Sequence, residues 1–185
     1  MSSSTTAESV SKEVIAFIQN VSYEDFPQEA IDLAKRCIID GLGVMLAGST
    51  QPAGKILYDY LAGTDTRQDA TVYGTNPFRT SAANAALLNG TSGHALDWDD
   101  TQLATSADRI FGLLTHPTIP PMVAALAIGE REGISGKQFL EAFLTGFEVE
   151  CKIAEAIHPD HYKKGFHSSA TAGTFGAATV VTKLL

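Results

Sequence analysis

The sequence contains few cysteines, no long apolar run and fewer basic than acidic residues, and each shortage excludes a class of protein. Only Cys37 and Cys151 occur in 185 residues, both within apolar helical patterns, so we expect buried free thiols in a reducing cytoplasm. No apolar run reaches the roughly 18 residues of a transmembrane helix, which argues against a membrane location. The 13 Lys and Arg against 21 Asp and Glu argue against nucleic acid as a partner.

Several motifs of well-known chemistries are also missing. The chain has no P-loop, no GxGxxG, no CxxC pair, no HExxH and no GxSxG. Nucleotide cofactors, structural zinc and acyl-serine chemistry are therefore disfavoured. Residues 1–6 lack the apolar stretch of a secretory signal, and we expect them to form a disordered tail.

Apolar residues recur at helical spacing along nearly the whole chain, so we expect an all-α fold. Residues 1–185 would form one multi-helix, bundle-like unit. Prolines and a capping box of Ser135 with Gln138 mark several helix starts. The expected helices lie near 10–21, 27–45, 56–61, 80–88, 120–127, 135–154 and 168–185, with a brief extended segment at 70–73.

Small residues predict where helices pack closely. Gly41 and Gly43 lower helix propensity, and we expect them to let a neighbouring helix approach. The last helix carries a small-residue stripe that includes Ala170 and Gly173, and its apolar side continues to Leu185 without a glycine stop. Because terminal leucines need covering, we expect the chain to be the first part of a larger unit.

Carboxylates and imidazoles gather in the segment HALDWDD. On a helix, His94, Asp97 and Asp100 would share one side, whereas Asp99 would point elsewhere. Such a cluster suits a divalent metal, and metal-dependent hydrolysis is one interpretation. We expect Asp99 and Asp100 to cap backbone amides at a helix end instead, and we assign no metal ligand. Trp98 is expected in the core.

Two further histidines precede expected helix starts. Pro117 holds His116 extended, and His167 stands directly before the last helix. The positive end of a helix disfavours the protonated imidazole, and a neutral imidazole can accept a proton. Both are therefore candidate acid–base groups, although a structural hydrogen-bonded role is an equal alternative. The same helix starts offer backbone N–H groups, which suit a substrate carboxylate.

These residues occur within a longer pattern that resembles the MmgE/PrpD family. The resemblance rests on five ordered segments: IIDGLGVMLAG, NGTSGHALDWDDT, HPT, SGKQFLEAFLTGFEVECKIAEA and YKKGFHSSATAGTFGAA. The family includes 2-methylcitrate dehydratases, cis-aconitate decarboxylases and an iminodisuccinate epimerase. Its members have a helical domain and a smaller α/β lid, with the active site between them. The resemblance implies that this chain is the first part of the helical domain, without the lid.

The resemblance also implies site residues and a cofactor-independent reaction. Asp97, Thr101, His116 and His167 match site positions of the family, whereas a lysine and another histidine of that site lie beyond this chain. Family reactions share proton transfer beside a carboxylate, without metal or organic cofactor. His116 and His167 would then act as base and acid, in either order. Asp97 would orient or stabilise an imidazole, and Thr101 and Ser168 would hold a substrate carboxylate.

We therefore expect part of a lyase for small di- or tricarboxylic acids, similar to 2-methylcitrate dehydratase and nearly inactive as the 185-residue chain alone. The partner would be a second copy in a homodimer, or a companion chain that supplies the lid. Alternatives are a decarboxylase or epimerase of the same family, or a non-catalytic helical module that pairs with another subunit. The stretch between Thr101 and His116 is longer than in the family's decarboxylases, and it would bring Arg109 near the site.

Overall fold

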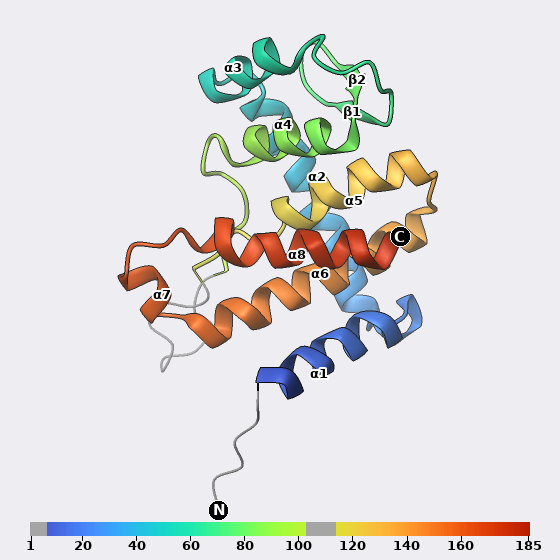
Figure 1. Ribbon diagram of the computed structural model, residues 1–185, viewed down its shortest axis with the longest axis vertical. Coiled ribbons are helices and arrows are strands. Elements are labelled where there is room, and N and C mark those ends of the chain that lie inside the picture. Colours follow the sequence, from blue (N-terminus) through green and yellow to red (C-terminus); the bar gives the residue numbers. More distant parts are fainter. Residues whose placement is uncertain (1–6, 103–113) are drawn as a thin grey trace, which may run out of the picture.

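Helices form nearly all the regular structure of the computed structural model, which describes residues 7–102 and 114–185 (Figure 1). This confirms the all-α expectation. The expected tail at 1–6 and Arg109 lie outside the described residues. The helices are α1 Ala7–Asn20, α2 Gln28–Gly48, α3 Pro52–Leu61, α4 Ala82–His94, α5 Ile119–Glu132, α6 Gly136–Ile157, α7 Asp160–Lys163 and α8 Ser168–Leu184, with a 3-10 turn, η1, at Tyr23–Asp25.

A small hairpin interrupts the helices between α3 and α4. Strands β1 (Ala70–Val72) and β2 (Phe78–Thr80) pair antiparallel, with Ala70 opposite Thr80. The sequence predicts the first strand but not its partner. Glu130 of α5 anchors the hairpin, because its carboxylate accepts hydrogen bonds from Thr71 and Arg79.

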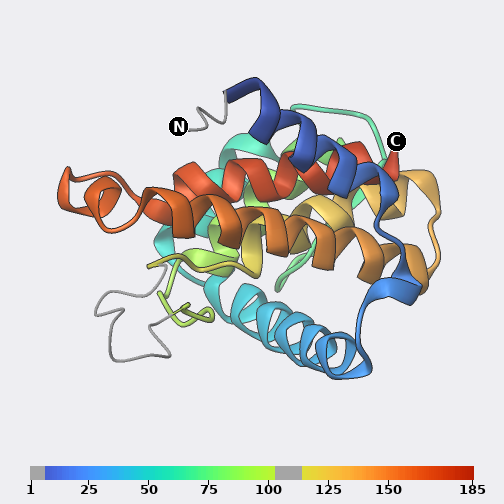
Figure 2. The ribbon, with the colours of Figure 1, turned by 90° about the horizontal axis from the view of Figure 1, so that it is seen from below.

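Helices α6 and α8 run antiparallel and side by side, with α7 at the turn between them (Figures 1 and 2). Glycines make this close approach possible. A Cβ atom on Gly146 would lie 2.7 Å from the carbonyl oxygen of Gly176, and one on Gly173 would lie 2.6 Å from Pro120 of α5. The small-residue stripe of α8 therefore packs against two helices, and Phe143 and Met122 fill the interior beside them.

The glycines of α2 differ from each other. A Cβ atom on Gly41 would lie 2.8 Å from the sulfur of Met122 in α5, which confirms the packing role expected of that residue. A Cβ atom on Gly43 would meet no atom of the described residues within 4 Å, so the same expectation is wrong there. Cys37 and Cys151 are both free thiols, as expected, but only Cys151 is buried and Cys37 is half-buried.

Helix ends bring the polar segments together. Ser81 and Ser135 cap α4 and α6 through their side chains, and the predicted capping box of Ser135 with Gln138 is present. Helix α4 ends at His94, so the aspartates of HALDWDD lie beyond it and not on a helical face, contrary to expectation. Asp97 takes a positive φ of 55°, which a continuing helix would not allow. Among the described residues, no helix is both long and apolar enough to cross a bilayer.

Candidate active site

The carboxyl end of α4 and the amino ends of α5 and α8 come close together. His94 is the last residue of α4, His116 lies just before α5, and His167 is the N-cap of α8. The His94 and His116 ring centroids lie 4.8 Å apart, and those of His94 and His167 lie 5.4 Å apart. Three of the chain's five histidines, widely separated in sequence, therefore converge.

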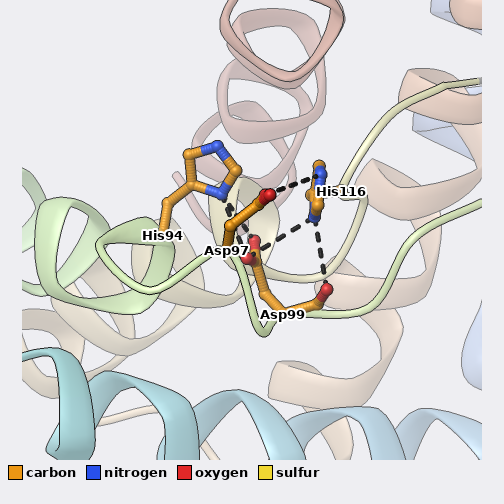
Figure 3. A group of neighbouring side chains, drawn as sticks. All are labelled: His94, Asp97, Asp99 and His116. Carbon is orange, nitrogen blue, oxygen red and sulfur yellow. Dashed lines mark hydrogen bonds and ion pairs between the residues drawn. The ribbon is translucent and has the colours of Figure 1, made fainter.

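Asp99 is the buried centre of this cluster (Figure 3). Its side chain is 1% exposed, and its carboxylate oxygens lie 2.9 and 3.0 Å from Nδ1 of His94. This hydrogen bond raises the pKa of His94, although burial of the ring opposes the shift. Because a carboxylate only accepts, Nδ1 of His94 carries the proton in this pair and Nε2 is the nitrogen left for chemistry.

His116 is held from three sides. Its Nδ1 lies 3.2 Å from the backbone carbonyl oxygen of Asp99, and its backbone N–H donates to the Ser169 hydroxyl at 2.9 Å. Its Nε2 lies 3.4 Å from Oδ1 of Asp97, whose side chain is 80% exposed. Since a carbonyl oxygen can only accept, Nδ1 of His116 carries hydrogen, and Nε2 is the nitrogen that can exchange a proton beside Asp97.

His167 has the opposite tautomer. Its Nδ1 accepts a hydrogen bond of 3.2 Å from the backbone N–H of Ala170, which caps the first turn of α8. An accepting Nδ1 has no proton, so the neutral ring carries its hydrogen on Nε2. Nε2 of His167 is therefore a hydrogen-bond donor, whereas Nε2 of His116 has a lone pair and can accept a proton.

A cavity of about 760 Å³ opens beside the cluster and is lined mainly by residues of α4, α5 and α8. His94, Asp99, His116 and His167 line its polar end, together with Ser169. The rest of its lining is mostly small or apolar and comes mainly from these three helices, for example Ala86, Leu87, Val123, Gly173 and Ala177, with Ala53 of α3 added. Such a cavity can hold a small organic molecule with its reactive carbon next to the imidazoles.

The two residues expected to hold a substrate carboxylate lie close to the cluster but outside the cavity lining. Thr101 is exposed, and its hydroxyl lies 3.5 Å from Nδ1 of His116. Ser168 is 2% exposed, and its buried hydroxyl has no hydrogen-bond partner among the described residues. Ser169, one position further, lines the cavity.

Two further acids, the half-buried Asp100 and the buried Glu150, lie next to the cluster in the structure. Asp100 accepts hydrogen bonds from the backbone N–H and hydroxyl of Thr118 at the start of α5, which confirms the capping role expected of it. Glu150 of α6 is fully buried and accepts a 2.9 Å hydrogen bond from Thr115, the neighbour of His116. Burial raises the pKa of Glu150 to about 8. The Glu150 side chain is therefore mostly uncharged at pH 7.

Sequence reasoning placed His94 in the cluster but gave it no role, and it assigned Asp99 to a cap. The structure instead places the Asp99 carboxylate against two imidazoles. A usable signal was the low helix propensity of Asp-Trp-Asp-Asp, which favours a helix end at His94 and frees the following residues to turn back. Trp98 is 66% exposed in this loop, so its expected core position is wrong.

Comparison with known proteins identifies the family. The MmgE/PrpD N-terminal domain matches residues 12–185. The chain is 28% identical to human cis-aconitate decarboxylase over 183 residues, which cover 96% of this chain and 36% of that protein. It is 30% identical to a cis-aconitate decarboxylase-like protein, oryM, of Aspergillus oryzae, and the match covers 98% of this chain and 38% of that protein. The Aspergillus terreus cis-aconitate decarboxylase is 24% identical, and the match covers 98% of this chain and 36% of that protein.

The chain thus spans little more than a third of the length of these relatives. The match to the family covers almost the whole of this chain, including every residue of the histidine and aspartate cluster. The fold is helical, as the resemblance implied. The chain belongs to the MmgE/PrpD family, whose N-terminal domain occupies residues 12–185.

Proposed function

We propose that this chain supplies the acid–base end of a cofactor-independent lyase site for small di- or tricarboxylic acids. The observation that carries the proposal is the convergence of His94, His116 and His167 on one cavity, each with one ring nitrogen engaged by a hydrogen-bond partner. Fixed tautomers are what general acid–base catalysis requires, because each ring must present a defined proton or lone pair. Family membership supports the same class of chemistry.

The tautomers suggest the order of proton transfer. His167 carries hydrogen on Nε2 and would act as the acid, while Nε2 of His116 would act as the base. Asp97, 3.4 Å from that nitrogen, would stabilise the positive charge on His116 after it has taken a proton. Thr101 and the amino ends of α5 and α8 would hold a substrate carboxylate, with Ser169, which lines the cavity, in the place expected of the buried Ser168.

Dehydration of a 2-methylcitrate-like substrate would use both groups. His116 would remove a proton from the carbon beside a carboxylate, and a carbon–carbon double bond would form as the carbon–oxygen bond breaks. The Nε2–H of His167 would hydrogen-bond to the departing hydroxide. The proton that His116 has taken would be passed to this hydroxide, which leaves as water, so both imidazoles end neutral.

Decarboxylation is the second candidate, because the relatives that the chain matches are named cis-aconitate decarboxylases. There the bond to a carboxylate carbon would break, carbon dioxide would leave, and an imidazole would protonate the resulting carbanion. The same site fits both reactions, since both need a proton moved next to a carboxylate. We further propose that the active protein is cytoplasmic and works as a homodimer, or with a companion chain that supplies a lid.

Histidine-ring NMR tests the proposal on the 185-residue chain itself. Titration with 2-methylcitrate or cis-aconitate should shift the ring signals of His94, His116 and His167. His158 and His161, which lie outside the cavity lining, serve as internal controls and should not move. If the ring signals of His94, His116 and His167 stay unchanged at a saturating concentration of the carboxylic acid, a non-catalytic helical module would be favoured.

Turnover tests the catalytic roles in the complete polypeptide that carries these residues. His116→Ala and His167→Ala should each lower turnover by about 10²–10⁴ while leaving the fold intact. We expect little or no turnover from the 185-residue chain alone. Assays with 2-methylcitrate and with cis-aconitate side by side would separate dehydratase from decarboxylase, and a variant with normal rates would remove that histidine from the mechanism.

A further inference from the structure

The cluster also has the geometry of a metal site. His94, Asp97, Asp99 and His116 can each offer one ligand atom, and these atoms all lie within 4.8 Å of one another (Figure 3). Nδ1 of His94 lies 2.9 Å from Oδ2 of Asp99, and Nε2 of His116 lies 3.4 Å from Oδ1 of Asp97. Ligands about 2.0–2.2 Å from a tetrahedral zinc ion lie roughly 3.3–3.6 Å apart. Small side-chain movements would therefore close the four groups around an ion.

We propose that these four side chains bind a divalent transition-metal ion such as Zn²⁺, and that the bound ion blocks proton transfer at the site. Two imidazoles with two carboxylates suit zinc, cobalt or nickel, whereas magnesium and calcium prefer oxygen ligands alone. Nothing in the sequence pattern assigns this ligand set, because Asp99 joins it only through the loop that follows α4.

The surroundings of His116 favour this ligand set. If Nε2 binds the ion, Nδ1–H keeps its hydrogen bond to the Asp99 carbonyl oxygen, 3.2 Å away. A ligating histidine commonly has such a partner for its second nitrogen, which fixes the tautomer and the ring orientation. Asp97 is 80% exposed and can move toward the ion without disturbing the core.

The blocking effect rests on the proposed function, whereas metal binding does not. Coordination would occupy Nε2 of His116, the nitrogen to which we assign the base. It would also displace the proton that His94 shares with Asp99. An ion at the cluster would then act as an inhibitor and not as a cofactor.

Calorimetry with ZnCl₂ on the tag-free 185-residue chain tests binding without any activity assay. We expect saturable binding of one ion per chain, and the absorption bands of tetrahedral cobalt when Co²⁺ replaces Zn²⁺. Asp97→Asn should weaken binding about tenfold or more. Asparagine suits this position because it tolerates the positive φ of 55°, and the exposed site leaves folding unaffected. Circular dichroism should confirm that the variant folds.

Asp160→Asn is the matched control. Asp160 is an exposed aspartate beside the other histidine pair, His158 and His161, and its replacement should leave zinc affinity unchanged. Zinc should shift the NMR ring signals of His94 and His116 but not those of His158 and His161. Absence of saturable binding, or binding that only Asp160→Asn weakens, would overturn the site.

Inhibition is measured separately, in the complete polypeptide with its carboxylic acid substrate. Turnover should fall as zinc saturates the site and recover with a chelator, and undiminished turnover with zinc bound would overturn the blocking effect. Should the polypeptide have no lyase activity at all, the proposed function and the inhibition that rests on it would fail. The calorimetric result would still decide metal binding.

Discussion

His94 and Asp99 form the closest contact between an imidazole and a carboxylate within the cluster, with 2.9 Å between Nδ1 and Oδ2. The two residues are five positions apart, yet they face each other because α4 ends at His94 and the chain then turns back. The contact fixes the proton on Nδ1 of His94 and leaves Nε2 free to react, in the same way that a buried carboxylate orients the histidine of a catalytic triad.

Removal of the Asp99 charge should lower the pKa of His94. In Asp99→Asn the carboxylate that raises this pKa is gone, while burial of the ring, which lowers it, remains. NMR titration of the His94 ring in the presence of a chelator measures the shift. Asp100→Asn is the control, because that carboxylate bonds to Thr118. An unchanged pKa in Asp99→Asn would mean that the contact does not persist in solution.

His167 should have a structural and a chemical role that can be separated. His167→Ala removes the N-cap of α8 and should lower the free energy of unfolding by about 1 kcal/mol. His167→Asn restores a capping side chain and should recover that stability, yet it has no imidazole and should remain impaired in turnover in the complete polypeptide. Urea unfolding of both variants gives the comparison. Equal stability of the two would show that the cap is unimportant.

Stability should depend on pH through Glu150. Its pKa is about 8 in the folded chain against an ordinary value of 4.5, so folding favours the protonated form. The contribution of Glu150 to the free energy of unfolding is therefore fully present below pH 4.5 and is lost as the pH rises through 8. Glu150→Gln, which mimics the neutral acid, should match the parent near pH 5. Above pH 8 it should be more stable, by roughly 2–5 kcal/mol.

The control for this prediction is Glu148→Gln on the same helix. Its side chain is 48% exposed, so its replacement should change stability little at either pH. Urea unfolding at pH 5 and pH 8.5 gives the difference in the free energy of unfolding between each of the two variants and the parent at each pH. A constant difference between Glu150→Gln and the parent across this range would contradict the raised pKa.

Two glycine substitutions should have opposite effects on stability. Gly146→Ala would place a Cβ atom 2.6 Å from Val180 and 2.7 Å from the Gly176 carbonyl oxygen, so α6 and α8 would have to separate. We expect a loss of about 1–3 kcal/mol in the free energy of unfolding. Gly43→Ala meets nothing within 4 Å among the described residues and should stabilise α2 by about 0.5–1 kcal/mol. Thermal unfolding measures both.

Most helix starts could be predicted from the sequence because the signals are local. The capping box at Ser135 and the start of α8 at Ser168 are where the pattern predicts them. The hairpin partner strand β2 was missed, since a three-residue strand carries too little periodicity. His116 and His167, which the resemblance pairs as base and acid, line one cavity, whereas their catalytic roles stay a prediction.

The sequence by itself determined the helical fold, the family and the histidines worth considering, because periodicity, caps and ordered motifs are properties of neighbouring residues. Only the tertiary structure decided that Asp99 joins two imidazoles, that His116 and His167 have opposite tautomers, and that Ser169 lines the cavity where Ser168 is buried. These features depend on contacts between α4, α5 and α8, which lie far apart in the chain. Helix packing sets the distances between them, and no local pattern encodes those distances.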